Sequence, residues 1–199
     1  MITDLDTNTA LVLIDLQQGI LEVAAHAHAA QPDKLAGMSS IPQVLDNAAK
    51  LITAFRKKGL PIVIVNVNSY GEAWTKTRKD NPLSGTQPPS ENYLKIVDDL
   101  PTDENDIFIT KHSWSAFFNT GLHEKLQKRQ VTNIVLGGVA TSIGVEGTAR
   151  DASVLGYNLS FVSDAMSDFT TEAHHHTITR IFPRIGETGT TEAVLAKLG

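Results

Sequence analysis

Two charged side chains stand where apolar, β-branched runs of the sequence end, and together they could move a proton. Asp15 lies near the end of the run "ALVLIDL", and Lys111 ends the run "DIFITK". If a fold holds the two away from water, each shifts the pKa of the other, and the carboxyl group becomes suited to general acid or base chemistry. From the residues alone, Asp15 as the cap of a turn and Lys111 as a solvated surface residue remain open interpretations.

A third feature is the glycine-rich stretch "GGVATSIGVEGTARD", residues 137–151, in which a buried strand is expected to run into a helix. A helix that begins near Ser142 would point backbone N–H groups at the end of the sheet, which suits an anion or an oxyanion. Glycine inside a helix costs about 1 kcal/mol relative to alanine, so its presence needs a reason. Close approach by a ligand and tight helix packing both remain open for Gly137, Gly138, Gly144 and Gly147.

The composition is that of a globular protein, with 41% hydrophobic and 20% charged residues in 199. A formal net charge of −5 argues against nucleic acid or an anionic membrane as partner. There is no cysteine, which excludes disulfide bonds, thiolate metal sites and a cysteine nucleophile. The first ten residues lack a basic segment, and the apolar runs are too short to span a bilayer. We therefore expect a cytoplasmic protein with one domain, residues 1–199.

Apolar runs alternate with amphipathic helical patterns along the chain. The runs are nearly continuous in hydrophobicity, as in parallel strands covered on both faces, and they comprise residues 10–16, 61–67, 106–111, 132–139 and 158–164. Helices are predicted over residues 41–59, 119–130, 142–156, 170–182 and 190–198. The predicted fold is α/β: a single-domain, doubly wound, mostly parallel sheet with helices on both faces, a Rossmann-like three-layer sandwich.

Two stretches lack a regular pattern. Residues 21–40 are predicted to be irregular, and residues 68–101, which are polar and rich in Pro, Gly and Ser, are predicted to form a binding loop or lid. The three histidines at residues 174–176 lie in a helical pattern, where adjacent side chains point in different directions. We interpret them as a solvated helix face rather than a metal site.

The ordered set of motifs resembles the isochorismatase-like hydrolase superfamily, also called the cysteine hydrolase family. "ALVLIDLQQGIL" is similar to its first-strand motif, and "TKHSWSAFFNTGL" is similar to its lysine motif. "GGVATSIGVEGTARDA" resembles the segment that carries a non-proline cis peptide and the nucleophile, and "FVSDAMSD" and "IFPRIGETGTTEAVLAKL" resemble its closing segments. The resemblance covers nearly the whole chain and, in its combination of motifs, is highly specific.

The resemblance assigns roles residue by residue. Asp15 is its catalytic carboxylate and Lys111 its catalytic lysine, the cis peptide falls between Val139 and Ala140, and the N–H groups of Ala140 and Gly144 line an oxyanion hole. The nucleophilic cysteine of the family falls on Gly144, and here the sequence departs from the pattern. The residues expected to contact substrate are Gln17, Asn68, Trp74, Arg78, Val139 and Thr141, with Asn66 and Lys79 near them. The resemblance also implies a small-molecule substrate and a homodimer or homotetramer.

Without a thiol, the covalent route of the family's amidases is closed. The true isochorismatases of the superfamily also lack the cysteine, and they hydrolyse a vinyl ether with the Asp as general acid. This chemistry is our expectation for Asp15, and the missing side chain at position 144 is expected to make space for a bulkier cyclic substrate. Nucleophilic substitution by Thr141 or Ser142 is disfavoured. No metal or cofactor is expected, because "VNVNSYGEAW" lacks the Asp and His residues that nicotinamidases use to bind a metal.

Two alternatives remain open at this point. One is a catalytically silent member of the family that binds a small molecule or a partner. The other is an amide or ester hydrolase in which Asp15 activates water.

Overall fold

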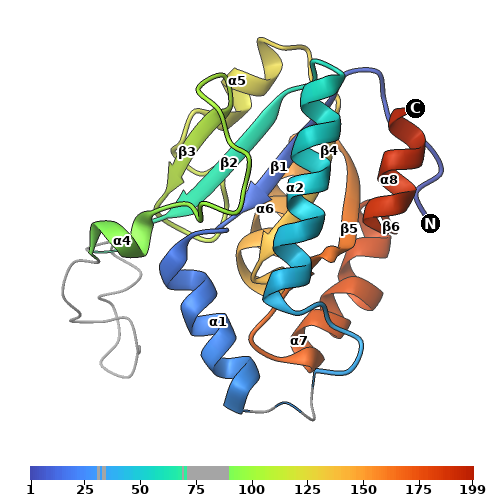
Figure 1. Ribbon diagram of the computed structural model, residues 1–199. Coiled ribbons are helices and arrows are strands. Elements are labelled where there is room, and N and C mark those ends of the chain that lie inside the picture. Colours follow the sequence, from blue (N-terminus) through green and yellow to red (C-terminus); the bar gives the residue numbers. More distant parts are fainter. Residues whose placement is uncertain (31, 33–34, 69, 71–89) are drawn as a thin grey trace.

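The computed structural model of the chain describes residues 1–30, 32, 35–68, 70 and 90–199 (Figure 1). Within these residues six strands form one sheet in the order β3-β2-β1-β4-β5-β6, and all neighbouring strands are parallel. The strands are β1 (Thr9–Ile14), β2 (Ile62–Val67), β3 (Ile107–Lys111), β4 (Asn133–Val139), β5 (Asn158–Ser167) and β6 (Glu187–Gly189). This is the strand order of doubly wound α/β proteins.

Alternate side chains of the central strands enter two cores, one on each face of the sheet. In β1, Leu11 and Leu13 pack into one core, while Ala10, Val12 and Ile14 pack into the other. A strand buried on both faces takes apolar side chains at nearly every position. All six residues of β1 are buried, and all but Thr9 are apolar. The central strands are therefore visible in the sequence as unbroken apolar runs.

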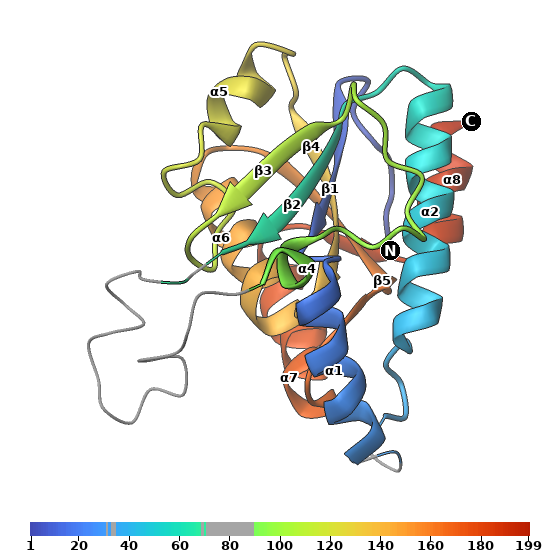
Figure 2. The ribbon, with the colours of Figure 1, turned by 60° about the vertical axis from the view of Figure 1, so that its left-hand side comes forward.

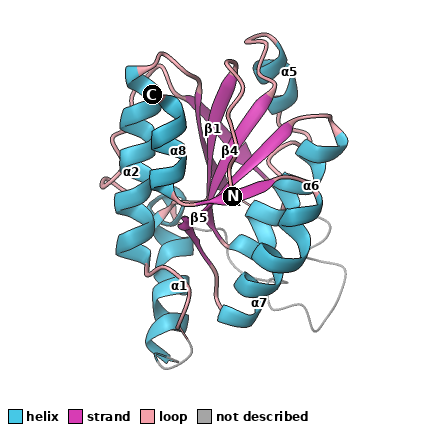
Figure 3. Cartoon of the chain, turned by 90° about the vertical axis from the view of Figure 1, so that its right-hand side faces the viewer, coloured by secondary structure: helices cyan, strands magenta, loops and turns pink. Residues whose placement is uncertain are grey.

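Helices cover both faces of the sheet, which confirms the predicted fold class (Figure 3). The helices α2 (Ile41–Lys57) and α8 (Thr191–Leu198) pack on one face, and α5 (Leu122–Gln127) and α6 (Glu146–Val154) pack on the other. Between β5 and β6 the chain forms α7 (Thr171–His176), a π-helical turn (Thr177–Ile181) and a 3-10 turn (Phe182–Arg184). No helix in the described part of the chain is long and apolar enough to cross a membrane.

The helix α1 (Gln18–Ala30) corrects one prediction, because residues 21–30 are helical rather than irregular. Leu21, Ala24 and His28 are buried along one side of this helix, three and four residues apart. Alanine favours the helix, but the buried side carries one large apolar residue, Leu21, beside Gly19, Ala24 and His28, so its periodicity is hard to recognise in the sequence.

The carboxyl ends of the parallel strands meet at one edge of the sheet. From β1 the chain proceeds to β2 and β3 on one side and then returns to β4 on the other. The ends of β1 and β4 therefore form the topological switch point at which such sheets bind ligands. The helix α1 and the short helix α4 (Glu91–Leu94) lie beyond this edge (Figure 2).

Candidate active site

Asp15 follows β1 directly and turns the chain out of the sheet. Its backbone N–H still donates to Val65 O of β2 at 2.9 Å. Its φ of +53° is left-handed, a conformation that Asp adopts more readily than most residues. The residue is only 4% exposed. The carboxyl group is thus held at the switch point and almost out of contact with solvent.

Lys111 is the last residue of β3, and its side chain reaches Asp15 across the end of β2. Its Nζ atom lies 2.8 Å from Oδ2 of Asp15, and both side chains are buried. Nζ also donates to the backbone oxygen of Ser113 at 3.1 Å. The structure therefore brings together the two charged residues that the sequence analysis singled out, as a desolvated ion pair.

Burial dominates the protonation of Asp15. It raises the pKa of the carboxyl group to about 6, although the charge of Lys111 and its hydrogen bond act in the opposite direction. The Oδ1 atom is also buried and has no hydrogen-bond partner among the described residues. Because Oδ2 accepts the hydrogen bond from the Lys111 ammonium group, Oδ1 is the oxygen of Asp15 that would carry a proton. At pH 7 a group with this pKa is protonated in roughly one molecule in ten.

Gly138 allows β4 to approach β1 beside Asp15. Its φ is +121°, and a Cβ atom there would lie 2.1 Å from the backbone oxygen of Ile14. No side chain can be accommodated at that distance. The peptide bond that follows β4, between Val139 and Ala140, is cis, at the place that the family resemblance implies. A π-helical turn (Thr141–Val145) then leads into α6.

Gly144 lies in this π-helical turn and faces the ion pair. A Cβ atom at this position would lie 3.0 Å from Oδ2 of Asp15, 3.4 Å from Nζ of Lys111 and 2.9 Å from Cγ2 of Ile14. The expected free space for a bulky substrate is therefore absent at this point, because the Asp15 carboxylate and Ile14 already occupy the surroundings of a side chain. What the glycine provides is direct contact between the turn and the carboxylate.

Thr148 connects the Lys111 segment to the turn that carries Gly144. Its hydroxyl donates to Gly144 O at 2.7 Å and accepts the backbone N–H of Ala116 at 3.0 Å. At the preceding residue, a Cβ atom on Gly147 would lie 3.0 Å from Cβ of Trp114. Tight packing thus accounts for Gly147, and Thr148 is a buried connection that the sequence analysis did not single out.

The whole arrangement can be compared with known proteins. Residues 9–193 match the model of the isochorismatase domain. The chain belongs to the isochorismatase family. This match confirms the resemblance that the motifs indicated. Because the chain has no cysteine, it cannot use a cysteine thiol as nucleophile.

Three similar proteins illustrate the family. The uncharacterized isochorismatase family protein YwoC of Bacillus subtilis (strain 168) is 40% identical over 193 residues, 96% of this chain and 94% of that protein. The ureidoacrylate amidohydrolase RutB of Pseudomonas syringae pv. syringae (strain B728a) is 29% identical over 182 residues, 83% of this chain and 71% of that protein. The structure of an isochorismatase family protein from Burkholderia thailandensis is 35% identical with a TM-score of 0.82 and covers 98% of this chain and 97% of that one. The chain is an isochorismatase-family hydrolase.

In this family member, Thr141 supports the turn after the cis peptide rather than offering a free hydroxyl. The residue is fully buried. Its Oγ1 donates to Ser167 O at 3.0 Å and lies 2.8 Å from Nδ1 of His174. Because the single hydroxyl proton goes to Ser167 O, Nδ1 of His174 must be the donor in the second bond. Only the backbone of Thr141 is left for a substrate.

His174 corrects the interpretation of residues 174–176 as a solvated face. His175 and His176 are exposed, but His174 is buried. Burial lowers the pKa of His174, and the nearby charge of Asp168 offsets part of that effect. The described residues contain no cluster of three or more His, Cys, Asp or Glu side chains suited to a metal ion.

Gln17 is fully buried, and its side chain is committed to the backbone. Its Oε1 accepts the N–H of Val67 at 2.6 Å, while Nε2 donates to Val67 O at 3.2 Å and to Tyr93 O at 3.1 Å. It therefore fixes the end of β2 and the α4 segment against the turn after Asp15. Val139 is also fully buried. The polar atoms of Gln17 are thus bonded to backbone groups, and the Val139 side chain packs in a hydrophobic core.

Asn68 follows β2 at the same edge of the sheet. Its N–H donates to Lys111 O at 2.9 Å, its backbone oxygen lies 2.6 Å from Nδ1 of His112, and its Oδ1 accepts the N–H of Tyr70 at 3.3 Å. The side-chain Nδ2 of Asn66, two residues earlier in β2, donates to Leu94 O at 3.0 Å. Trp74, Arg78 and Lys79 lie outside the described residues, as does most of the predicted binding loop.

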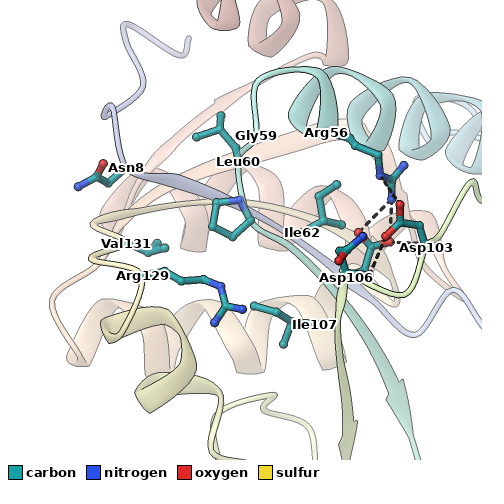
Figure 4. Close-up of a pocket in the computed structure, with 12 residues that line it drawn as sticks. Asn8, Arg56, Gly59, Leu60, Ile62, Asp103, Asp106, Ile107, Arg129 and Val131 are labelled. Carbon is teal, nitrogen blue, oxygen red and sulfur yellow. Dashed lines mark hydrogen bonds and ion pairs between the residues drawn. The ribbon is translucent and has the colours of Figure 1, made fainter.

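A separate cavity of about 500 Å³ opens at the opposite edge of the sheet, near the starts of the strands (Figure 4). Asn8, Pro61 and Ile107 line it. Its Arg56 is already engaged, with NH2 2.8 Å from Oδ2 of Asp106. None of the residues around Asp15 contributes to this cavity, so we do not assign it to the reaction.

Proposed function

We propose that the protein hydrolyses the vinyl ether of an isochorismate-like small molecule, with Asp15 as general acid and no covalent intermediate. The observation that carries this proposal is the buried Asp15 carboxyl group, with its pKa raised to about 6 and its Oδ1 atom free of any partner among the described residues. An acid of this strength can hold a proton near neutral pH and still release it to carbon.

The reaction balances with Asp15 and water alone. The enol-ether methylene takes the proton from Oδ1, the O–H bond breaks, and an oxocarbenium ion forms as Asp15 becomes a carboxylate. Water adds to the cation and gives up a proton, which returns Asp15 to its acid form. The hemiketal then collapses to pyruvate and the second product, an alcohol.

Lys111 supports this role although it lowers the pKa of Asp15. Its ammonium group lies 2.8 Å from Oδ2, so it stabilises the negative charge that appears on Asp15 when the proton leaves. Burial favours the acid before the reaction, and Lys111 favours the carboxylate during it. The opposing effects suit a group that must both hold and release a proton.

A second candidate is amide hydrolysis by water that the Asp15 carboxylate activates. The similarity to RutB, which is named an amidohydrolase, favours it. This route needs the ionised form of Asp15, whereas the vinyl-ether route needs the protonated form. The two candidates therefore predict opposite effects of pH.

The deciding assay measures pyruvate release from isochorismate and from 2-amino-2-deoxyisochorismate, coupled to lactate dehydrogenase. We expect release by the wild-type protein and its loss in Asp15→Asn. Asp106→Asn is the matched control, because it breaks a largely buried ion pair at the opposite edge of the sheet; its activity should persist. If neither compound yields pyruvate, the proposal is wrong. Ammonia from N-carbamoylsarcosine or ureidoacrylate, lost in Asp15→Asn, would favour the second candidate.

A further inference from the structure

The segment Tyr93–Val97 runs antiparallel to the residues that follow Asp15. The backbone N–H of Gln18 donates to Lys95 O at 2.8 Å, and that of Val97 donates to Leu16 O at 3.2 Å. Gln17 and Ile96 form an isolated antiparallel bridge between these bonds. The α4 end of this segment is thereby fixed beside the turn that carries the Asp15 carboxyl group.

Tyr93 is the residue of this segment that lies against the start of α1. A Cβ atom on Gly19 would be 1.9 Å from Cδ2 of Tyr93 and 2.3 Å from Cε2. The ring therefore lies directly on the Gly19 backbone, and only glycine permits this contact. The backbone oxygen of Tyr93 is held by Gln17 Nε2 at 3.1 Å. Ring and backbone are both fixed, which limits where the hydroxyl can point.

The negative charge of Asp15 affects the phenol group of Tyr93. Burial and the negative charge of Asp15 raise the pKa of Tyr93. The phenol therefore keeps its proton at neutral pH and acts as a hydrogen-bond donor. Tyr93 is only partly buried, and its hydroxyl has no hydrogen-bond partner within the described residues. A ring fixed beside the turn that carries Asp15, with a hydroxyl that has no partner among the described residues, is an arrangement that packing alone does not require.

We propose that Tyr93 contacts the substrate of the Asp15 site and donates its O–H to a substrate oxygen next to the carbon that Asp15 protonates. This assignment rests on the proposed function. The ligand class is a small molecule with an ether or carboxylate oxygen close to the reacting carbon. The ring positions the donor through its contact with Gly19, and the hydroxyl contributes the hydrogen bond.

The first test is Tyr93→Phe, which keeps the ring on Gly19 and removes only the hydroxyl. We expect kcat/KM for pyruvate release to fall about tenfold, as for the loss of one hydrogen bond in the transition state, with an unchanged urea midpoint of unfolding. Tyr157→Phe is the matched control: its hydroxyl binds His123 Nδ1 at 2.9 Å in the core on the other face of the sheet, and kcat/KM should persist. Full activity of Tyr93→Phe, where Asp15→Asn has none, would overturn the assignment and leave the proposed function standing.

A second test needs no substrate. The ionisation of tyrosine is followed by absorbance, and the transition that is missing in Tyr93→Phe belongs to Tyr93. In Asp15→Asn this transition should move to lower pH, because the nearby negative charge is gone, whereas Asp106→Asn should leave it in place. If Asp15→Asn does not move it, Tyr93 is not next to Asp15 and the inference is wrong. If wild-type protein releases no pyruvate, the proposed function fails, and the Tyr93 contact is judged on this titration.

Discussion

The Oδ2 atom of Asp15 lies 3.0 Å from the point at which a Cβ atom on Gly144 would stand. The position on which the family resemblance places the nucleophilic cysteine therefore lies against the carboxylate of Asp15. The same point is 3.4 Å from Nζ of Lys111. A side chain at position 144 would contact both members of the ion pair, so Gly144 lies against the candidate site as well as within the turn.

Gly144→Ala tests this contact. The added methyl group would come within 2.9 Å of Ile14 Cγ2 and 3.0 Å of Asp15 Oδ2, so the carboxyl group must shift by some tenths of an ångström. We expect kcat/KM for pyruvate release to fall roughly tenfold, because proton transfer depends on placement of the donor. Circular dichroism should show an intact fold. Wild-type kinetics in this variant would mean that the position of Asp15 next to residue 144 has no part in the reaction.

Lys111→Met tests the opposing effects on Asp15. The positive charge of Lys111 and its hydrogen bond lower the pKa of Asp15, so their removal should raise that pKa above about 6. The pH midpoint of pyruvate release should then move to higher pH. Lys50→Met serves as control, because Lys50 forms an exposed pair with Asp46, and its midpoint should stay in place. A midpoint that remains at 6 or falls in Lys111→Met would contradict the role assigned to this lysine.

Thr141→Val tests the buried connection behind the cis peptide. The substitution keeps the shape of the side chain but leaves His174 Nδ1 and Ser167 O without their partner. Each unsatisfied buried group costs about 1–3 kcal/mol, so the free energy of unfolding from urea denaturation should fall by at least this amount. Thr53→Val, at an exposed site whose hydroxyl donates to Ala49 O, should change it by no more than about 0.5 kcal/mol. Equal effects of both variants would rule out the buried connection.

The strand ends could be predicted because the central strands are buried on both faces. The unbroken apolar run of β1 places Asp15 at the carboxyl edge of the sheet. Lys111 could be placed there from the shorter run of β3, although β3 is an edge strand with alternating burial. The resemblance of the motif around Gly144 implies the position of the absent thiol. By contrast, β6 (Glu187–Gly189) has three partly buried residues and no apolar run. No pattern of hydrophobicity could indicate it.

The supporting contacts could not be read from the sequence, because they join segments far apart in the chain. Gln17 holds Tyr93, which lies 76 residues further along, and Thr141 meets His174 across 33 residues. Neither Tyr93 nor His174 belongs to one of the motifs that resemble the family. For His174, a helical pattern with three adjacent histidines gave no sign of which one would be buried, since that depends on the position of the turn after β4.

The pH dependence of kcat/KM for pyruvate release from isochorismate is the most direct test of Asp15 as general acid. This parameter reports the pKa of the free enzyme. Because the protonated form of Asp15 is the reactive one and its pKa is about 6, activity should be constant at lower pH and should fall tenfold per pH unit above 6. A rate that instead rises as the pH passes through 6 would mean that the carboxylate is the reactive form, and general acid catalysis by Asp15 would be contradicted.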